Sequence, residues 1–157
     1  MIFDEKFKDN YISYILQSAL AGLTIVVVML FLNIANQSVI IAALGATAFI
    51  VFAMPNSNTA KFRNVVGGHF IGILSGFIFF SLTTIEIIQI PYIHAFAVSL
   101  AVLLMVVTDT EHPPAAATAL GISVAGFSFN LGLFTLISAL ILATTHFVLK
   151  PWLKDLV

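Results

Sequence analysis

Long apolar stretches separated by short polar ones make up most of the chain. The apolar runs cover residues 13–32, 39–54, 65–82, 93–108, 115–127 and 131–149. They do not alternate with period two, as the strands of a transmembrane barrel do. Helices satisfy their own backbone hydrogen bonds in lipid, and about 20 apolar residues cross roughly 30 Å of hydrocarbon. The pattern therefore predicts an all-α, polytopic transmembrane helical bundle with about five full spans and one short helix.

The polar segments divide this bundle from its ends. We expect residues 1–12 to form a polar or amphipathic lead-in, 13–149 the transmembrane domain, and 150–157 a short cytoplasmic tail. The first residues include Asp4 and Glu5, where a cleavable signal peptide would carry basic residues. The first apolar run is therefore expected to stay in the mature protein.

Composition supports a membrane protein. Hydrophobic residues make up 61% of the sequence and charged residues 8%, whereas soluble domains carry about 25% charged residues. This excludes an ordinary soluble domain, a disordered chain and a nucleic-acid binder, which needs a basic surface. There are no cysteines, so thiol chemistry is excluded. Because motifs such as HExxH and GxSxG are also absent, we expect no enzyme and no cofactor or metal.

The basic residues indicate the orientation in the membrane. All six lie near residues 6–8, 61–63 and 150–154. Six crossings place them on one side, which the positive-inside rule makes cytoplasmic together with both termini. A re-entrant segment over 115–127 would instead put the last lysines on the opposite side. We favour six crossings.

Residues 108–116 carry the strongest candidate chemistry. Adjacent prolines are tolerated only in the first turn of a helix, so a helix should begin near Pro113. Its unpaired amides would attract an anion. The alternative is an ordinary helix start, capped by Thr110 or Asp109. The candidate binding residues of this segment are Thr108, Asp109, Thr110, Glu111, His112, Pro113, Pro114, Ala115 and Ala116.

A second candidate group begins at Arg63 and Asn64 and ends at His69. The planar guanidinium of Arg63 suits a small planar anion, although it is equally a charge at the membrane interface. Asn64 is placed to cap the following helix. His69 either handles a proton or substrate, or is a buried histidine bonded to a neighbouring helix. Glycines at every fourth position allow close helix packing; they are Gly68, Gly72 and Gly76.

Other polar positions have simpler interpretations. The small residues of 42–48 are expected to serve helix packing, and His94 and His146 to lie at the membrane interface. Asp109, Glu111 and His112 are metal-ligand types, but three acceptors at one bend make a poor zinc site unless His69 completes it.

The Thr108–Leu120 segment resembles the HPP family of integral membrane proteins, named for His-Pro-Pro. Further blocks match in the family's order: Gly45-Ala46-Thr47-Ala48, Phe52-Ala53-Met54-Pro55, and Arg63-Asn64-Val65-Val66-Gly67-Gly68-His69. The resemblance implies a small helical membrane domain, commonly with four or five spans. Plant-plastid and cyanobacterial members are associated with nitrite transport, and many bacterial members have no assigned substrate. We expect a multi-pass protein of the bacterial cytoplasmic (inner) membrane.

Three functional hypotheses remain. In the first, the protein transports a small inorganic anion, with nitrite as candidate, attracted by Arg63, His69 and the helix start, while His112 couples proton movement. The second is a proton or cation pathway through Asp109, Glu111 and His112. The third is a non-transporting membrane scaffold or a metal-dependent membrane enzyme. Because six thin helices enclose little space, we expect a homo-oligomer within the lipid bilayer and no nucleic-acid partner.

Overall fold

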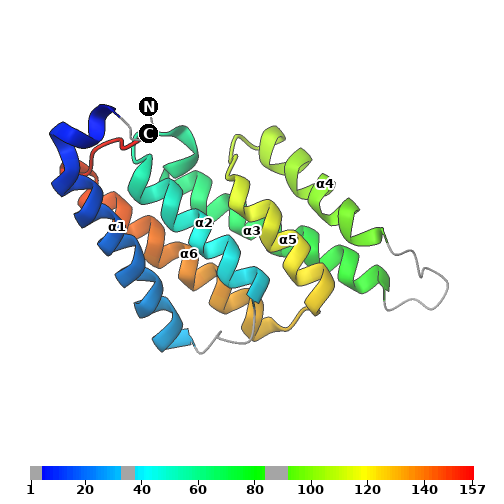
Figure 1. The fold of residues 1–157 in the computed structure, drawn as a ribbon. Helices are drawn as coiled ribbons and strands as arrows, with labels where there is room; N and C mark the ends of the chain where they lie inside the picture. Colours follow the sequence, from blue (N-terminus) through cyan, green and yellow to red (C-terminus); the bar gives the residue numbers. More distant parts are fainter. Residues whose placement is uncertain (1–4, 33–37, 84–91) are drawn as a thin grey trace.

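The computed structural model describes residues 5–32, 38–83 and 92–157. In these ranges it contains helices and no strands, which confirms the all-α bundle (Figure 1). The predicted turn at 33–38 and loop at 83–92 lie almost wholly outside the described residues. The helices are α1 (Glu5–Leu32), α2 (Ser38–Ala53), η1 (Asn58–Ala60), α3 (Phe62–Thr83), α4 (Ile93–Val107), α5 (Pro113–Ala125), α6 (Phe129–Leu149) and η2 (Lys150–Trp152).

Of the six α-helices in the described part of the chain, three are long and apolar enough to cross a membrane, and they are α1, α3 and α6. The other three have 16, 15 and 13 residues, or about 20–24 Å at 1.5 Å per residue. The expectation of five full spans is therefore too high, because α2 and α4 are short. Helix α2 ends at Ala53, next to Met54, whose helical conformation is disfavoured by the following Pro55.

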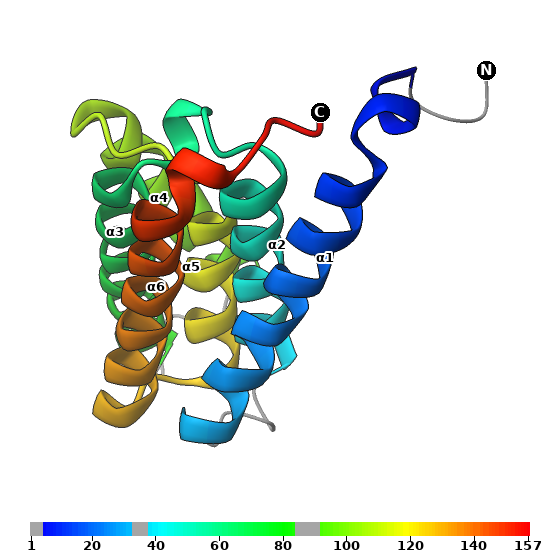
Figure 2. The ribbon, with the colours of Figure 1, turned by 90° about the vertical axis from the view of Figure 1, so that its left-hand side faces the viewer.

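Successive helices run in opposite directions, so the beginning of α1 and the C-terminal residues lie at the same end of the bundle (Figures 1 and 2). Hydrogen bonds join the two segments there: Tyr14 Oη donates to the Leu156 carbonyl at 2.7 Å, and Lys154 Nζ donates to Asn10 Oδ1 at 2.9 Å. The turns before α3 and α5 lie at this end too. We call it the basic end, since it carries Lys6, Lys8, Lys61, Arg63, Lys150 and Lys154.

Helix α1 starts at Glu5 and is kinked at Asn10, where the backbone is not helical (φ −131°, ψ 18°). The predicted lead-in over 1–12 thus includes a helical segment and the kink that follows it. Helix α5 leads away from the basic end, and α6 returns to it (Figure 2). The last lysines therefore lie with Lys61, as six passes require and a re-entrant segment would not allow.

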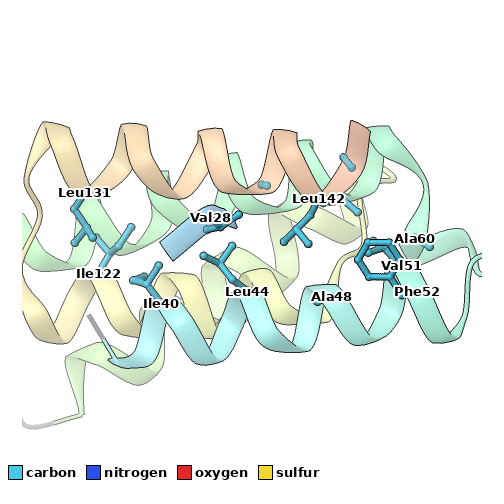
Figure 3. Close-up of a cluster of buried hydrophobic side chains, with 13 residues drawn as sticks. Val28, Ile40, Leu44, Ala48, Val51, Phe52, Ala60, Ile122, Leu131 and Leu142 are labelled. Carbon is cyan, nitrogen blue, oxygen red and sulfur yellow. The ribbon is translucent and has the colours of Figure 1, made fainter. Parts of the chain in front are cut away.

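Two apolar clusters fill the bundle. The larger joins α1, α2, α5 and α6, and includes Val28, Leu44, Ile122 and Leu142 (Figure 3). The smaller joins α3, α4 and α5 through side chains that include Ala101. Helix α5 contributes to both clusters, so the short helix that follows the paired prolines lies in the middle of the molecule.

The backbones of α3 and α5 touch along a row of glycines. A Cβ atom on Gly68 would lie 2.7 Å from the Cβ of His112, and one on Gly76 would lie 2.8 Å from the Ala119 carbonyl oxygen. A Cβ on Gly72 would overlap the Ala115 carbonyl oxygen. The close packing expected of this row thus occurs inside the chain, and the row is not free to serve between protomers.

A methyl group at Gly72 should weaken the fold. Gly72→Ala forces α5 away from α3, and overpacking of this kind costs about 1–3 kcal/mol. Gly45→Ala is the matched control, because no atom outside the local backbone of its own helix lies within 4 Å of the added carbon. We expect thermal unfolding in detergent to begin at a lower temperature for Gly72→Ala only. Equal unfolding temperatures for the two variants would contradict the packing described here.

Candidate functional site

The turn between α4 and α5 is shaped by the way α4 ends. The Thr110 amide donates to the Met105 carbonyl at 2.9 Å, and the Asp109 amide donates to Val106 at 3.3 Å. This pair of bonds is the Schellman motif, which needs a left-handed residue after the helix. Asp109 fills that position with φ 54°, at a cost that glycine would avoid. The sequence places an acidic residue where glycine is usual, and its carboxylate has a partner on α3.

That partner is Arg63, in the first turn of α3. Its Nη1 donates to Asp109 Oδ2 at 3.0 Å and its Nη2 donates to the Thr108 carbonyl at 2.6 Å. Both side chains are exposed, so the ion pair itself stabilises the fold by about 0–1 kcal/mol. Its main consequence is chemical, because an incoming anion must compete with Asp109 for the guanidinium.

A cavity of about 410 Å³ opens beside this pair at the basic end. Its lining includes the cations Lys61 and Arg63 and the anions Asp109 and Glu111, so the formal charges balance. The amide Nδ2 of Asn64 donates to the Glu111 carbonyl at 3.2 Å and ties α3 to the turn. We call this cavity the polar pocket, and it is lined by Asn58, Thr59, Lys61, Arg63, Asn64, Asp109 and Glu111.

Helix α5 begins where the paired prolines predict, but its first amides do not face the polar pocket. His112 is the extended N-cap residue, and the prolines occupy the first two helical positions. The Ala115 amide donates to the His112 carbonyl at 2.9 Å, and Ala115 is fully buried. The groove beside Pro113 and Ala116 is apolar, because α4 lines it with Val102, Met105 and Val106.

Unpaired amides open to water, which the attraction of an anion to this helix start would need, are therefore not found at Ala115. Side-chain capping, the alternative, is also absent, because no side chain caps α5. The hydroxyl of Thr110 instead lies 2.8 Å from that of Thr108. Thr110 is buried against Gly67, and Pro114 is buried as well.

Two buried histidines meet below the polar pocket. His112 Nδ1 donates to the Thr59 carbonyl at 2.8 Å, and His112 Nε2 lies 2.9 Å from Thr47 Oγ1. The same hydroxyl lies 2.9 Å from His69 Nε2, and His69 Nδ1 lies 2.9 Å from Thr118 Oγ1. We call this set the His–Thr network: the Thr59 carbonyl with the side chains of His112, Thr47, His69 and Thr118.

The network leads from the wall of the polar pocket into the middle of the bundle. Thr59 lines the pocket, whereas Thr47, His69 and Thr118 are fully buried. Burial lowers the pKa of His112 to about 4, although the hydrogen bond to Thr59 favours the charged ring. His112 is therefore neutral near pH 7, and the network is polar without a fixed charge.

Sequence reasoning found both histidines but missed their partners. Thr47 lies in the run assigned to helix packing, and both Thr47 and Thr118 lie in segments that resemble the HPP family, but no binding role was predicted for them or for Thr59. A signal was present for Thr47, because it carries the only hydrogen-bonding side chain between residues 42 and 48. Its partners come from α3 and from the turn before α5, and no local pattern reveals them.

The remaining histidines lie away from the network. His146 lies in the last turn of α6, where it is buried and its Nε2 donates to the Pro55 carbonyl at 3.0 Å. Helix α6 presents this face to the turn before α3. His94 Nδ1 lies 2.9 Å from Ser123 Oγ at the far end of the bundle.

The acidic residues do not assemble a metal site with these rings. Within residues 5–32, 38–83 and 92–157, no three His, Asp or Glu side chains are grouped closely enough to hold a metal ion. His69 therefore does not complete a site with Asp109 and Glu111, as the metal-enzyme hypothesis required. It pairs instead with the two threonines of the network.

Comparison with known proteins agrees with this architecture. Residues 7–153 match the family model described as HPP, transmembrane region. The chain belongs to this HPP transmembrane family. Over 86 residues, or 55% of its length, this HPP chain is 36% identical to a transmembrane protein of Dictyostelium discoideum, and it covers 30% of that relative. No solved structure matches it. The HPP chain is thus a multi-pass membrane protein in contact with lipid.

Replacing Asp109 in the HPP chain should separate backbone strain from charge pairing. Asp109→Gly removes a left-handed penalty of roughly 1–2 kcal/mol and loses an exposed ion pair worth about 0–1 kcal/mol. Asp109→Ala loses the pair and keeps the penalty. We expect the glycine variant to unfold at a temperature equal to or above that of the wild type, and the alanine variant below it. An alanine variant more stable than the glycine variant would show that strain is not present here.

Proposed function

We propose that this HPP protein transports a small inorganic anion across the membrane, with nitrite as the candidate, and that the anion enters through the polar pocket. The observation that carries the proposal is the path of polar groups from the pocket into an otherwise apolar bundle. Polar and ionisable side chains at membrane depth are expensive and mark the routes of substrates and ions. The family resemblance supports nitrite, because some members are associated with its transport.

The pocket offers suitable donors for a planar oxyanion. Arg63 presents two parallel N–H groups, the geometry that binds carboxylate-like anions in a bidentate manner. Asp109 Oδ2 lies 3.0 Å from Arg63 Nη1, so the carboxylate pairs with the charge of the guanidinium and fixes its orientation. The anion would displace the Asp109 carboxylate from Arg63 and add one negative charge to a pocket whose four formal charges otherwise balance. This supports a transient site, which releases its ligand readily, rather than a tight one.

The orientation of the protein follows from its basic end. We propose that the basic end faces the cytoplasm, in accord with the positive-inside rule, and that the membrane is the bacterial inner membrane. We also propose a homo-oligomer. Helix α1 would be the natural contact, because it packs loosely at the edge of the bundle and exposes Leu16, Leu23 and Leu30.

Flux through reconstituted protein tests the proposed site. Arg63→Ala and His112→Asn should each lower nitrite uptake into proteoliposomes about ten-fold or more, because the first removes the guanidinium donors and the second removes the imidazole ring that would carry a proton. Asparagine at 112 keeps a donor that can reach the Thr59 carbonyl, so the turn is expected to fold. Lys150→Ala, an exposed basic residue at the same end outside the pocket, is the control and should transport normally. Unchanged uptake in both site variants would remove the proposed route, and no wild-type uptake would favour the scaffold.

A cation or proton pathway is the second candidate, and the carboxylates of Asp109 and Glu111 in the pocket favour it. The Asp109→Asn variant distinguishes the cation pathway from anion transport. It frees the Arg63 guanidinium at nearly constant volume, so anion uptake should rise about two- to ten-fold at low substrate, in line with the weak coupling of an exposed pair. A cation pathway loses an attracting charge and should slow. Parallel measurement of nitrite and sodium fluxes decides which of these occurs.

A further inference from the structure

The His–Thr network holds more acceptors than hydrogens, and this fixes where each hydrogen lies. A carbonyl oxygen only accepts, so His112 Nδ1 must carry a hydrogen toward Thr59 at 2.8 Å. A neutral imidazole then has no hydrogen on Nε2, which must accept one. The hydroxyl of Thr47, 2.9 Å away, is the donor in reach.

The rest of the network follows from that first bond. A hydroxyl has a single hydrogen, so Thr47 cannot also donate to His69. His69 Nε2 must therefore donate to Thr47 at 2.9 Å, and its bare Nδ1 must accept from the Thr118 hydroxyl at 2.9 Å. The Ala43 carbonyl, 3.0 Å from Thr47 Oγ1, competes for the same hydrogen. Donation to Ala43 would leave a buried ring nitrogen of His112 unpaired, at a cost of about 1–3 kcal/mol.

At rest every hydrogen bond of the network thus points from Thr118 toward the polar pocket. We propose that the His–Thr network is a proton relay, in which the Thr47 hydroxyl passes one proton between His69 and His112. The coupling of this proton to a transported anion rests on the proposed function. The relay itself follows from the four side chains alone.

One transfer through the relay balances as follows. The Thr118 hydroxyl gives its hydrogen to His69 Nδ1 and takes a new one from a hydronium ion, which becomes water. The His69 ring then has hydrogens on both nitrogens. The Nε2–H bond of His69 breaks as a new O–H bond forms on Thr47, and the original hydrogen of Thr47 moves to His112 Nε2. His112 then holds the extra proton with both N–H groups bonded, to Thr47 and to Thr59. His69 is left neutral with its hydrogen on Nδ1, and each bond between the rings has reversed its direction.

Few charged groups oppose or assist this transfer. Among the described residues, α2 and α5 carry no ionisable side chain, and α4 carries only His94, bonded to Ser123 far from the pocket. On α6, His146 donates to Pro55 rather than to the network. The polar pocket beside His112 is lined by Lys61, Arg63, Asp109 and Glu111, the residue that precedes His112. A proton on His112 is therefore next to a pocket that water and an anion can reach.

Nitrogen-15 spectra of labelled histidine in the full chain test the relay without any transport assay. At pH 7 the wild type should show His112 protonated on Nδ1 and His69 on Nε2. Thr47→Val removes the bridging hydroxyl at constant shape, so His69 should change to the Nδ1–H form and donate to Thr118, while His112 stays as it was. Thr47→Ser should keep the wild-type pattern. Thr135→Val, which removes a buried hydroxyl bonded only to its own helix, is the matched control.

Either of two spectral results overturns the relay. One is a wild-type His69 that already carries its hydrogen on Nδ1, and the other is a His69 unaffected by Thr47→Val. The Thr47→Ser and Thr135→Val variants show whether a substitution disturbs the fold in general. If Thr47→Val misfolds, the wild-type spectrum alone still shows which nitrogen of His69 carries the hydrogen.

Proton flux then separates the relay from the proposed function. In proteoliposomes with a trapped pH dye, wild-type nitrite uptake should be accompanied by proton uptake, and Thr47→Val should lower the proton flux about ten-fold or more. Thr47→Ser and Thr135→Val should retain it. Nitrite uptake without protons overturns the relay and leaves anion transport standing. Proton entry under an imposed pH gradient, lost in Thr47→Val but with no nitrite uptake, supports the relay and overturns the anion proposal.

Discussion

The direct contact between the backbones of α3 and α5 is the constraint on which the candidate site depends. Hydrogen bonds tolerate only a few tenths of an ångström beyond their usual length. His69 from α3 reaches Thr118 on α5 at 2.9 Å, and Gly68 lies directly against His112. Any side chain in the glycine row would separate the helices and lengthen these bonds. The close contact at the glycines therefore allows the rings of His69 and His112 to lie on either side of the Thr47 hydroxyl.

Histidines also fix the wall of the polar pocket. The turn before α3 is held from one side by His112 at the Thr59 carbonyl and from the other by His146 at the Pro55 carbonyl. Asp155 accepts from the backbone and side chain of Asn56 in the same turn. A segment that must expose its backbone to the pocket is thus tied to α5, to α6 and to the residues after α6. These contacts on several sides hold the segment in one place beside the polar pocket.

The sequence was informative wherever structure depends on neighbours along the chain. The paired prolines predict the start of α5, and the glycine spacing predicts a close helix contact. The six apolar runs match six helices, although two of these are shorter than a full span. Prediction failed where partners come from distant segments. Thr47 lies on a helix that is apolar nearly all round, so its hydroxyl gives no periodic signal, and the direction of the Ala115 amide depends on how α4 packs beside it.

The shortness of α2, α4 and α5 has a consequence for the surrounding lipid. These helices measure about 20–24 Å, against a hydrocarbon layer of roughly 30 Å, while α3 and α6, with 22 and 21 residues, match it. A bilayer adjusts to such hydrophobic mismatch by local thinning. Thinning beside α2 and α4 would bring both aqueous phases nearer to the centre of the protein. The distance over which a solute must leave water would then be set by the three short helices rather than by the membrane itself.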